Sequence, residues 1–534
     1  MQADVVVIGS GAAGLTAALT SALHGASVVV LERARLLGGT SAMSGGMLWI
    51  PNNRFMRAAG MSDSREEALT YLRLLTLGRV DDELIQTYLD ECNATIDFLE
   101  AHTNLRFQAH TAHPDYQPEL PGAKPGGRGL GAGTYDTSRL GELERLLRFG
   151  PNDRLLDLDV NPDDERAVQA LNELDGHTAR SGRALVGELL EACTNHGVQF
   201  LPSTRARELV RTPAGVGGVR ADSDQGHNIF YARWGVVLAS GGFEWNRSLV
   251  ARFMHVPLVV PSSSPSNQGD GLLMAMRAGA ALGNMTEAWW APATHVAGEA
   301  YEDGPLNRHV SDPRSKPGSI VVNRAGRRFA NEALNYNDFP RAMMVFDPTT
   351  WDFPNIPAYL IFDEQFRCSY RILALSRGEP PPEWLLCAPT VRELAACAGI
   401  DSSGLELQVR EFNEAAARGE DTAFGRGTGI YDRYRGDPRV APNPNLRPLG
   451  PGPYYALEMR IGGLGTKGGP VIDSHARVLD PDGVPIAGLY AAGNVAASVM
   501  GPSYPGPGAT LGPATTFGRL AGESLGHTRE GLSA

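Results

Sequence analysis

The stretch V-V-V-I-G-S-G-A-A-G, residues 5–14, decides the fold of this 534-residue chain. Val5 to Ile8 is a short apolar, β-branched run, which is typical of a parallel strand buried on both faces. The glycine-rich turn comes next, and Leu15 to Leu23 then predicts an Ala-rich helix. A second apolar strand at Ser27 to Leu31 ends at Glu32. Together these elements predict one βαβ unit.

The three glycines of the turn and the acid at Glu32 indicate what this unit binds. Gly9 permits the tight turn, Gly11 lets a pyrophosphate approach the backbone, and Gly14 lets the helix pack on the strand. The free N–H groups at the start of the helix attract the phosphates. Glu32 follows Gly14 by 18 residues, where its carboxylate can accept hydrogen bonds from ribose hydroxyls. The pattern predicts a Rossmann-type dinucleotide-binding domain.

Two further segments favour FAD over NAD as the dinucleotide. The loop G-G-T-S-A-M-S-G-G at residues 38–46 offers three hydroxyls beside four glycines, which suits a phosphate and a ribityl chain. A distant A-A-G-N at residues 491–494 would bring the C-terminal segment onto the same cofactor. An elongated ligand held from both ends of the chain fits FAD better. The predicted cofactor-binding residues are Gly9, Gly11, Ala12, Ala13, Gly14, Glu32, Arg33, Gly39, Thr40, Ser41, Ser44, Gly45, Gly46, Ala239, Gly241, Asp270, Gly493, Asn494 and Leu511.

The order of segments predicts an α/β protein whose FAD-binding domain is split by an inserted α+β catalytic domain. The composition changes at Ala288 to Trp290, where aromatic residues and proline cluster. After Gly452 the sequence again resembles the N-terminal nucleotide-binding part. We therefore expect the FAD-binding domain over residues 1–287 and 452–534, and the catalytic domain over residues 288–451.

Other segments carry simpler predictions. Residues 62–102 have apolar and acidic residues at helical spacing, whereas residues 104–133 are rich in Pro, Gly and His and predict a loop. Residues 153–166 are predicted to be a charged surface stretch, and a closing helix is expected from about Pro513 to Leu525.

Composition excludes several function classes. A net charge of -12 disfavours binding to nucleic acid or to anionic membranes. The five cysteines are scattered and form no C-x-x-C, so we predict neither a disulfide framework nor a metal site. There is no run of about 18 apolar residues and no basic leader with an apolar core, so we expect a cytoplasmic protein without a transmembrane segment.

Several motifs resemble one enzyme family. The N-terminal fingerprint with its G-G-T-x-A-x-S-G-G loop is similar to flavoproteins of the fumarate reductase and ketosteroid dehydrogenase superfamily. Further stretches resemble the 3-ketosteroid Δ1-dehydrogenase branch, and the resemblance spans almost the whole chain, least clearly at residues 134–175. These stretches are A-W-W-A-P at 288–292, N-R-A-G-R-R-F-A-N-E-A-L-N-Y at 323–336, D-P-R-V-A-P-N-P-N-L-R-P-L at 437–449, L-G-T-K-G-G at 464–469 and G-P-S-Y-P-G-P-G-A-T-L-G-P-A-T-T-F-G at 501–518.

The resemblance implies FAD-dependent removal of two hydrogens from adjacent ring carbons beside a ketone, with an external electron acceptor. By resemblance, the Tyr504 hydroxyl and the Gly508 N–H would donate hydrogen bonds to the ketone oxygen and stabilise the developing enolate. Tyr336 would remove the α proton, and Tyr116 would support it by hydrogen bonding. The covalently flavinylated branch has a histidine in the 38–46 loop, where this chain has Gly39 and Thr40, so FAD is expected to be non-covalent.

Alternatives remain open from the sequence. The C1–C2 bond of a 3-ketosteroid is the expected substrate site, and a smaller cyclic ketone such as a 4-oxocyclohexane carboxylate is the alternative. A fumarate reductase-like enzyme or a Δ4-(5α)-ketosteroid dehydrogenase ranks third. The motifs near the flavin contain no arginine for a dicarboxylate, and the Δ4-(5α) branch lacks the Y-P-G-P-G pattern found here at residues 504–508. A protein that binds FAD without dehydrogenase chemistry is a further class. Trp289 and Trp290 suit a pocket wall or a core, whereas His113 and His295 are expected to be ordinary histidines.

Overall fold

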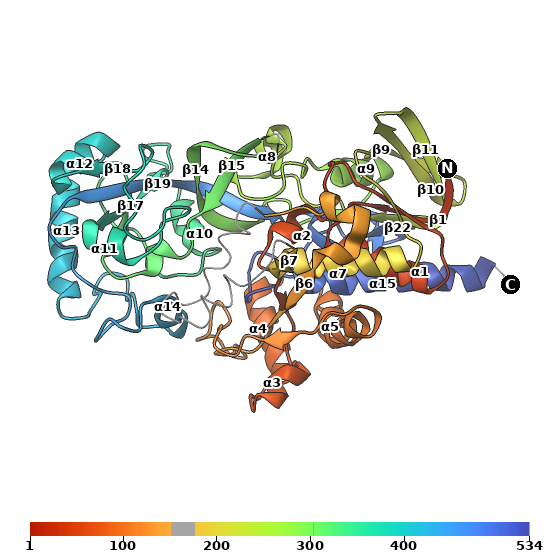
Figure 1. The fold of residues 1–534 in the computed structure, drawn as a ribbon, viewed down its shortest axis with the longest axis horizontal. Coiled ribbons are helices and arrows are strands. Elements are labelled where there is room, and N and C mark those ends of the chain that lie inside the picture. Colours follow the sequence, from red (N-terminus) through yellow and green to blue (C-terminus); the bar gives the residue numbers. More distant parts are fainter. Residues whose placement is uncertain (151–176, 303, 533–534) are drawn as a thin grey trace.

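The structure, a computed structural model, describes residues 1–150, 177–302 and 304–532. The charged stretch predicted at residues 153–166 lies outside the described residues. Figure 1 shows an elongated molecule in which β1 and the C-terminal helix α15 lie in one lobe and helices α11 to α13 lie in the other. Among the described residues, no helix has both the length and the apolar character needed to cross a membrane.

The first lobe is built on an eight-stranded sheet whose centre is β1. Val5, Val6 and Val7 are completely buried, as expected for a strand covered on both faces. β1 pairs in parallel with β2 on one side and with β11 on the other. The order of the sheet is β21 (Arg477–Leu479), β22 (Pro485–Ala491), β11 (Gly226–Leu238), β1 (Gln2–Ile8), β2 (Val28–Leu31) and β8 (Gln199–Leu201), and β10 (Gly215–Ser223) joins β11 to β9 (Arg205–Thr212).

The second lobe is built on a seven-stranded sheet around the long strand β19. In Figure 1 this blue strand runs from the second lobe toward the first. The order is β15 (Gly304–His309), β14 (Ala288–Tyr301), β19 (Tyr454–Thr466), β17 (Ala358–Asp363) and β16 (Ser319–Val322), with β12 (Val260–Pro261) and β18 (Leu386–Ala388) also paired to β19. The predicted domain bounds stay a prediction, although β12 and β19 carry this sheet beyond residues 288–451 on both sides.

The first helix, α1, and the closing helix, α15, pack on the first sheet and on each other. A Cβ added at Gly518 of α15 would lie 2.5 Å from the Ala13 carbonyl oxygen, so the two helices approach at backbone distance. The segment predicted to be helical at residues 62–102 forms two helices, the first of which is capped by the Ser64 side chain. This lobe contains α1 (Ala12–Leu23), α2 (Gly39–Met43), α4 (Arg65–Thr76), α5 (Asp82–His102), α7 (Ser181–Asn195), α9 (Asp270–Ala278) and α15 (Leu511–Leu532), and α14 (Ile430–Arg435) lies in the other lobe.

The remaining elements are short. The predicted loop at residues 104–133 contains two strands, because its backbone pairs with β3. The small strands are β3 (Leu48–Trp49), β4 (Gln108–Ala109), β5 (Gly129–Gly131), β6 (Thr134–Asp136), β7 (Thr178–Arg180), β13 (Leu282–Gly283) and β20 (Gly469–Pro470). The other helices are α3 (Arg54–Ala58), α8 (Arg247–Phe253), α10 (Phe339–Met343), α11 (Glu364–Ser369), α12 (Val391–Ala398) and α13 (Ser402–Ala416), and the 3₁₀ helices are η1 (Thr137–Leu146), η3 (Pro313–Ser315) and η4 (Gly493–Val495).

Candidate active site

A cavity of about 1270 Å³ opens at the carboxyl ends of the parallel strands and extends under the second sheet. This edge is where open α/β sheets bind their ligands. Every predicted cofactor-binding residue except Gly14 lines the cavity, and all four predicted catalytic residues line it too. Gly14 instead packs α1 on the sheet, since a Cβ there would lie 2.1 Å from the Gly9 carbonyl oxygen. That packing is the role predicted for it.

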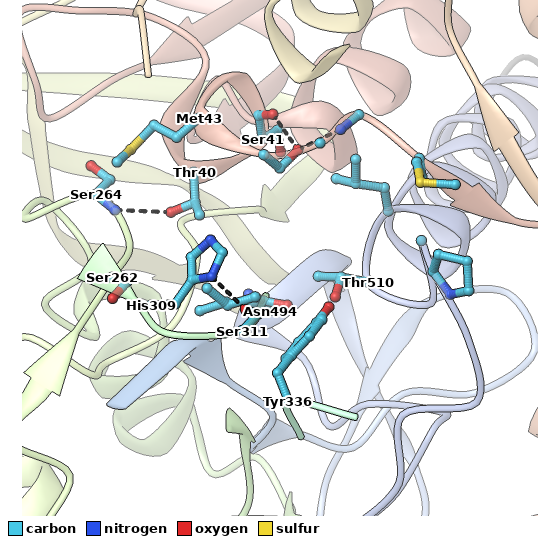
Figure 2. A pocket seen from close by; sticks show the side chains of 18 of the residues that line it. Thr40, Ser41, Met43, Ser262, Ser264, His309, Ser311, Tyr336, Asn494 and Thr510 are labelled. Carbon is cyan, nitrogen blue, oxygen red and sulfur yellow. Dashed lines mark hydrogen bonds between the residues drawn. The ribbon is translucent and has the colours of Figure 1, made fainter. Parts of the chain in front are cut away.

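The glycine-rich turn packs so closely against neighbouring backbone that a side chain at Gly9 would not fit. Gly9 has φ +107°, and a Cβ there would lie 2.3 Å from the Ala239 carbonyl oxygen. The turn is braced by the predicted hydroxyl loop, because the Ala12 N–H donates to Ser41 Oγ at 3.0 Å. Figure 2 shows Thr40 beside Ser264, whose N–H donates to Thr40 Oγ1 at 3.1 Å. Backbone and hydroxyl groups therefore converge on a phosphate-sized space.

The acidic residues of the dinucleotide end are held in place by their own partners. Glu32 is buried and accepts hydrogen bonds from Ser10 Oγ at 2.7 Å and from the Ala34 N–H at 2.8 Å. Asp270 forms ion pairs with Arg33 at 3.0 Å and Arg205 at 2.6 Å. These bonds fix both carboxylates at the wall of the cavity. There the Glu32 carboxylate could orient a ribose by accepting hydrogen bonds from its hydroxyl groups.

The C-terminal segment closes the same cavity, as predicted. Gly493 and Asn494 follow β22, and Leu511 begins α15. Asn494 Oδ1 accepts a hydrogen bond from Trp289 Nε1 at 2.9 Å, which anchors the turn to the second sheet. A long cavity with helix N-termini of α1 and α15 on its wall fits a dinucleotide with a large ring system, and therefore fits FAD.

Three tyrosines from distant parts of the chain meet in the cavity. The Tyr116 hydroxyl donates to the Tyr336 hydroxyl at 3.1 Å. The ring centroids of Tyr116 and Tyr336 both lie close to that of Tyr504, at 5.1 and 5.5 Å. Thr510 Oγ1 donates to the Tyr504 hydroxyl at 3.2 Å, and in Figure 2 Tyr336 points into the cavity toward Thr510. The structure thus brings together three phenols that the sequence placed only by resemblance.

The environment of these phenols keeps them protonated at neutral pH. Burial raises the pKa of Tyr336 well above its ordinary value, and Tyr116 and Tyr504 raise it further. Burial also raises the pKa of Tyr504, although hydrogen bonds from Thr510 and Tyr336 oppose the shift. A neutral Tyr504 can donate a hydrogen bond to a substrate oxygen that only accepts hydrogen bonds, such as a ketone oxygen.

Gly508 lies beside these phenols with its backbone exposed to the cavity. It has φ +93°, and a Cβ there would lie 2.5 Å from the backbone of Met47, so no side chain fits. Among the described residues, none accepts a hydrogen bond from its N–H. This amide and the Tyr504 hydroxyl are therefore two donors available to one ligand oxygen.

Comparisons with known proteins identify the family of this chain. A model of the FAD binding domain family matches residues 4–511. The chain is 38% identical to a 3-oxosteroid 1-dehydrogenase of Mycobacterium tuberculosis, over 97% of each protein. Its structure superposes with a TM-score of 0.93 on the 3-ketosteroid Δ1-dehydrogenase from Sterolibacterium denitrificans, solved with 1,4-androstadiene-3,17-dione, at 35% identity over 99% of this chain and 100% of that one. The chain belongs to the 3-ketosteroid Δ1-dehydrogenase family.

Membership of this family confirms the predicted α/β fold, the cofactor FAD and the oxidoreductase class that acts on CH–CH donors. Within the family, the chain is also 41% identical to the 4-oxocyclohexanecarboxylate 2-dehydrogenase of Sinomonas cyclohexanicum, over 98% of this chain and 92% of the relative. The roles of individual site residues stay predictions, and so does the non-covalent attachment of FAD.

In this member of the Δ1-dehydrogenase family, a buried lysine supports the tyrosine segment from behind. Lys467 Nζ donates to the Ser503 carbonyl oxygen at 2.5 Å and lies 4.1 Å from the centre of the Trp289 ring. That ring packs edge-on against Tyr504 at 4.8 Å. Burial lowers the pKa of Lys467 to about 7. The T-K-G-G motif therefore holds the backbone that carries Tyr504.

Sequence reasoning missed several residues of the site. Thr510, Ser264 and Asn267 line the cavity. Thr510 lies within the 501–518 motif, whereas no motif contains Ser264 or Asn267. His113, predicted to be an ordinary histidine, lines it as well. Trp289 and Trp290 do not line it and are fully buried behind it, while His295 lies outside it and is exposed. Basic residues at the end remote from the dinucleotide, among them Arg435 and Arg439, were also missed, because the 437–449 motif assigns no role to Arg439 and no motif contains Arg435.

Proposed function

We propose that this family member desaturates a cyclic ketone at the bond next to its carbonyl group. The observation that supports the proposal is the meeting of Tyr116, Tyr336, Tyr504 and Gly508 in the cavity that fits FAD. Their spacing suits a ring whose oxygen is held at one point while the neighbouring carbon loses a proton.

Each protein group has a defined part in this chemistry. The Tyr504 O–H and the Gly508 N–H donate to the ketone oxygen and stabilise the negative charge that develops when the α proton leaves. The ionised form of Tyr336 takes that proton and becomes a neutral phenol, and Tyr116 stabilises the phenolate beforehand by donating a hydrogen bond to its oxygen. When bound, FAD supplies the acceptor for the hydride from the adjacent carbon. The walls of the cavity orient the ring between these groups.

Two substrate classes are compatible with this chemistry. The resemblance implies the C1–C2 bond of a 3-ketosteroid, whereas the Sinomonas relative is named for a monocyclic oxo acid. An external electron acceptor completes each turnover in this proposal, and location in the cytoplasm stays a prediction.

The test is anaerobic reduction of the bound flavin by candidate ketones. The yellow holoenzyme is mixed with 4-androstene-3,17-dione or with 4-oxocyclohexanecarboxylate, and bleaching is followed by absorbance. We expect bleaching with at least one ketone and an α,β-unsaturated product. A protein that stays yellow with every cyclic ketone would instead use flavin as a structural or sensing element.

A further inference from the structure

Glu244 is a buried acid that neither the motifs nor the proposed desaturation uses. It follows β11 by a short turn that carries Ala239 and Gly241, two residues that line the cavity, and only 3% of its surface is exposed. Burial raises the pKa of this carboxyl, and the groups that most oppose the shift are hydrogen-bond donors rather than cations. Burying a carboxylate without a cation is costly, so these hydrogen bonds must offset the cost. The residues that donate them therefore define what the carboxylate holds in place.

Three groups donate hydrogen bonds to the Glu244 carboxylate. Ser263 Oγ donates to Oε1 at 2.5 Å, and Asn267 Nδ2 donates to the same oxygen at 2.7 Å. The Thr466 N–H donates to Oε2 at 3.2 Å. Because the Trp245 Nε1–H donates to Ser263 Oγ at 3.1 Å, the Ser263 hydrogen can point to Glu244. Both carboxylate oxygens therefore act as acceptors, as they do in the ionised form.

The side-chain amide of Asn267 connects Glu244 to Thr40. Its Nδ2 carries two hydrogens, and the second of them is donated to Thr40 Oγ1 at 3.0 Å. An amide carries its hydrogens only on nitrogen, so the Glu244 carboxylate fixes which side of the Asn267 amide faces Thr40. Without that carboxylate, the amide could rotate by half a turn and present its oxygen to Thr40 instead.

The Thr40 hydroxyl consequently has its oxygen occupied and its hydrogen available. Thr40 Oγ1 accepts from Asn267 and from the Ser264 N–H at 3.1 Å, and neither N–H group can accept a bond in return. A hydroxyl has two acceptor lone pairs and a single hydrogen. Within the described part of the chain, no residue accepts that hydrogen. Thr40 lines the cavity, as Figure 2 shows, so the hydrogen is left for a ligand that accepts it.

We propose that Glu244 positions the cofactor from outside the cavity: through Asn267, it makes the Thr40 hydroxyl a hydrogen-bond donor to FAD. Glu244 is not among the residues that line the cavity, so it is a positioning residue rather than a binding residue. The phosphate oxygens and the ring system of FAD offer acceptors that suit a hydroxyl donor. Because the inference concerns FAD binding alone, it does not depend on which ketone is oxidised.

The first experiment measures how fast the holoenzyme releases FAD. The holoenzyme is diluted, and release is followed by the rise in flavin fluorescence. Glu244→Gln supplies one acceptor oxygen where the carboxylate supplies two, so it cannot satisfy both the Thr466 N–H and the Asn267 amide. We expect this variant to release FAD about tenfold faster.

Glu188→Gln is the matched control for this experiment. Glu188 is also buried and also has a raised pKa, but it does not line the cavity and accepts from the Asn104 N–H at 3.0 Å. FAD release in this variant should equal that of the wild type. Unchanged release in Glu244→Gln, or equal acceleration in both variants, would overturn the inference.

The second experiment asks whether Glu244 acts through the Thr40 hydroxyl. Thr40→Val removes the hydroxyl and should release FAD about tenfold faster, whereas Thr40→Ser should stay within about twofold of the wild type. In the Thr40→Val background, Glu244→Gln should add no further acceleration, because both substitutions remove the same hydrogen bond. Effects that multiply to about 100-fold in the double variant would show that Glu244 acts independently of Thr40, and would overturn the inference. If Glu244→Gln does not fold, Asn267→Ala replaces it in the same comparison, and wild-type release in Thr40→Val alone would also overturn the inference.

Discussion

The phenolic oxygens of Tyr116 and Tyr336 lie 3.1 Å apart, although 220 positions separate the two residues in the sequence. One tyrosine comes from the segment between α5 and β5, and the other precedes α10. Tyr116 is buried and Tyr336 is half-buried beside Tyr504, so a hydrogen bond from one phenol would stabilise the ionised form of the other. In the proposed mechanism, this link makes proton removal by Tyr336 depend on Tyr116, which does not itself take the proton.

Tyr116→Phe tests this coupling. The pKa of Tyr336 is raised well above its ordinary value by burial, so we expect wild-type flavin reduction to accelerate with pH up to at least about pH 10. Loss of the Tyr116 hydroxyl should slow reduction by about tenfold and move the rise to higher pH, since the Tyr336 phenolate loses its donor. Stopped-flow absorbance across the pH range measures both effects. An unchanged profile would show that Tyr116 is only a packing residue.

Tyr504→Phe should impair chemistry without releasing the cofactor. Removal of one donor to the ketone oxygen is expected to slow flavin reduction by about 10²- to 10³-fold, the usual effect of losing an oxyanion donor. FAD content should stay at the wild-type level. Tyr454→Phe is the control, because its hydroxyl donates to the Gly450 carbonyl oxygen in the second lobe, away from the cavity. Wild-type rates in Tyr504→Phe would remove this residue from the mechanism.

Gly9→Ala should abolish retention of FAD. The added methyl group would lie 2.3 Å from the Ala239 carbonyl oxygen at φ +107°, so the turn that approaches the pyrophosphate must move. The ratio of flavin to protein absorbance after gel filtration reports the loss. Gly304→Ala serves as the control, since its nearest contact would be 3.6 Å and its φ is not positive. Full flavin content in Gly9→Ala would show that the turn tolerates the shift.

Lys467→Met should change how stability depends on pH. Burial lowers the pKa of Lys467 to about 7 in the folded protein, below its unfolded value of about 10.4. Between these values the unfolded chain binds more protons, so the free energy of unfolding of the wild type rises with pH relative to the variant. Urea unfolding of both proteins at several pH values measures the difference. A constant difference between about pH 7 and pH 10 would contradict the shifted pKa.

The sequence predicts the dinucleotide end of the site far better than the substrate end. The role of Gly9 and Gly14 follows from local backbone geometry, and the structure has both where the motif requires. Tyr116 could be located only through resemblance, because its neighbours in the sequence carry no signal and its partner is 220 positions away. Arg435 also lines the cavity, and it was missed because a charged residue on a short helix is usually solvated. The pairing of β19 with β14 and β17 in the second sheet could not be predicted either, because the spacing of apolar residues does not specify which strands pair.

The closing helix α15 has a consequence for how the enzyme is made. A nascent polypeptide that has left the ribosome only as far as β19 possesses the pyrophosphate turn but lacks Asn494, Tyr504 and Gly508. In the proposed mechanism, FAD binding and the hydrogen bonds from Tyr504 and Gly508 to the ketone oxygen therefore both depend on this segment, which is synthesised last. A single proteolytic cleavage before residue 493 would accordingly be expected to remove both FAD binding and substrate binding.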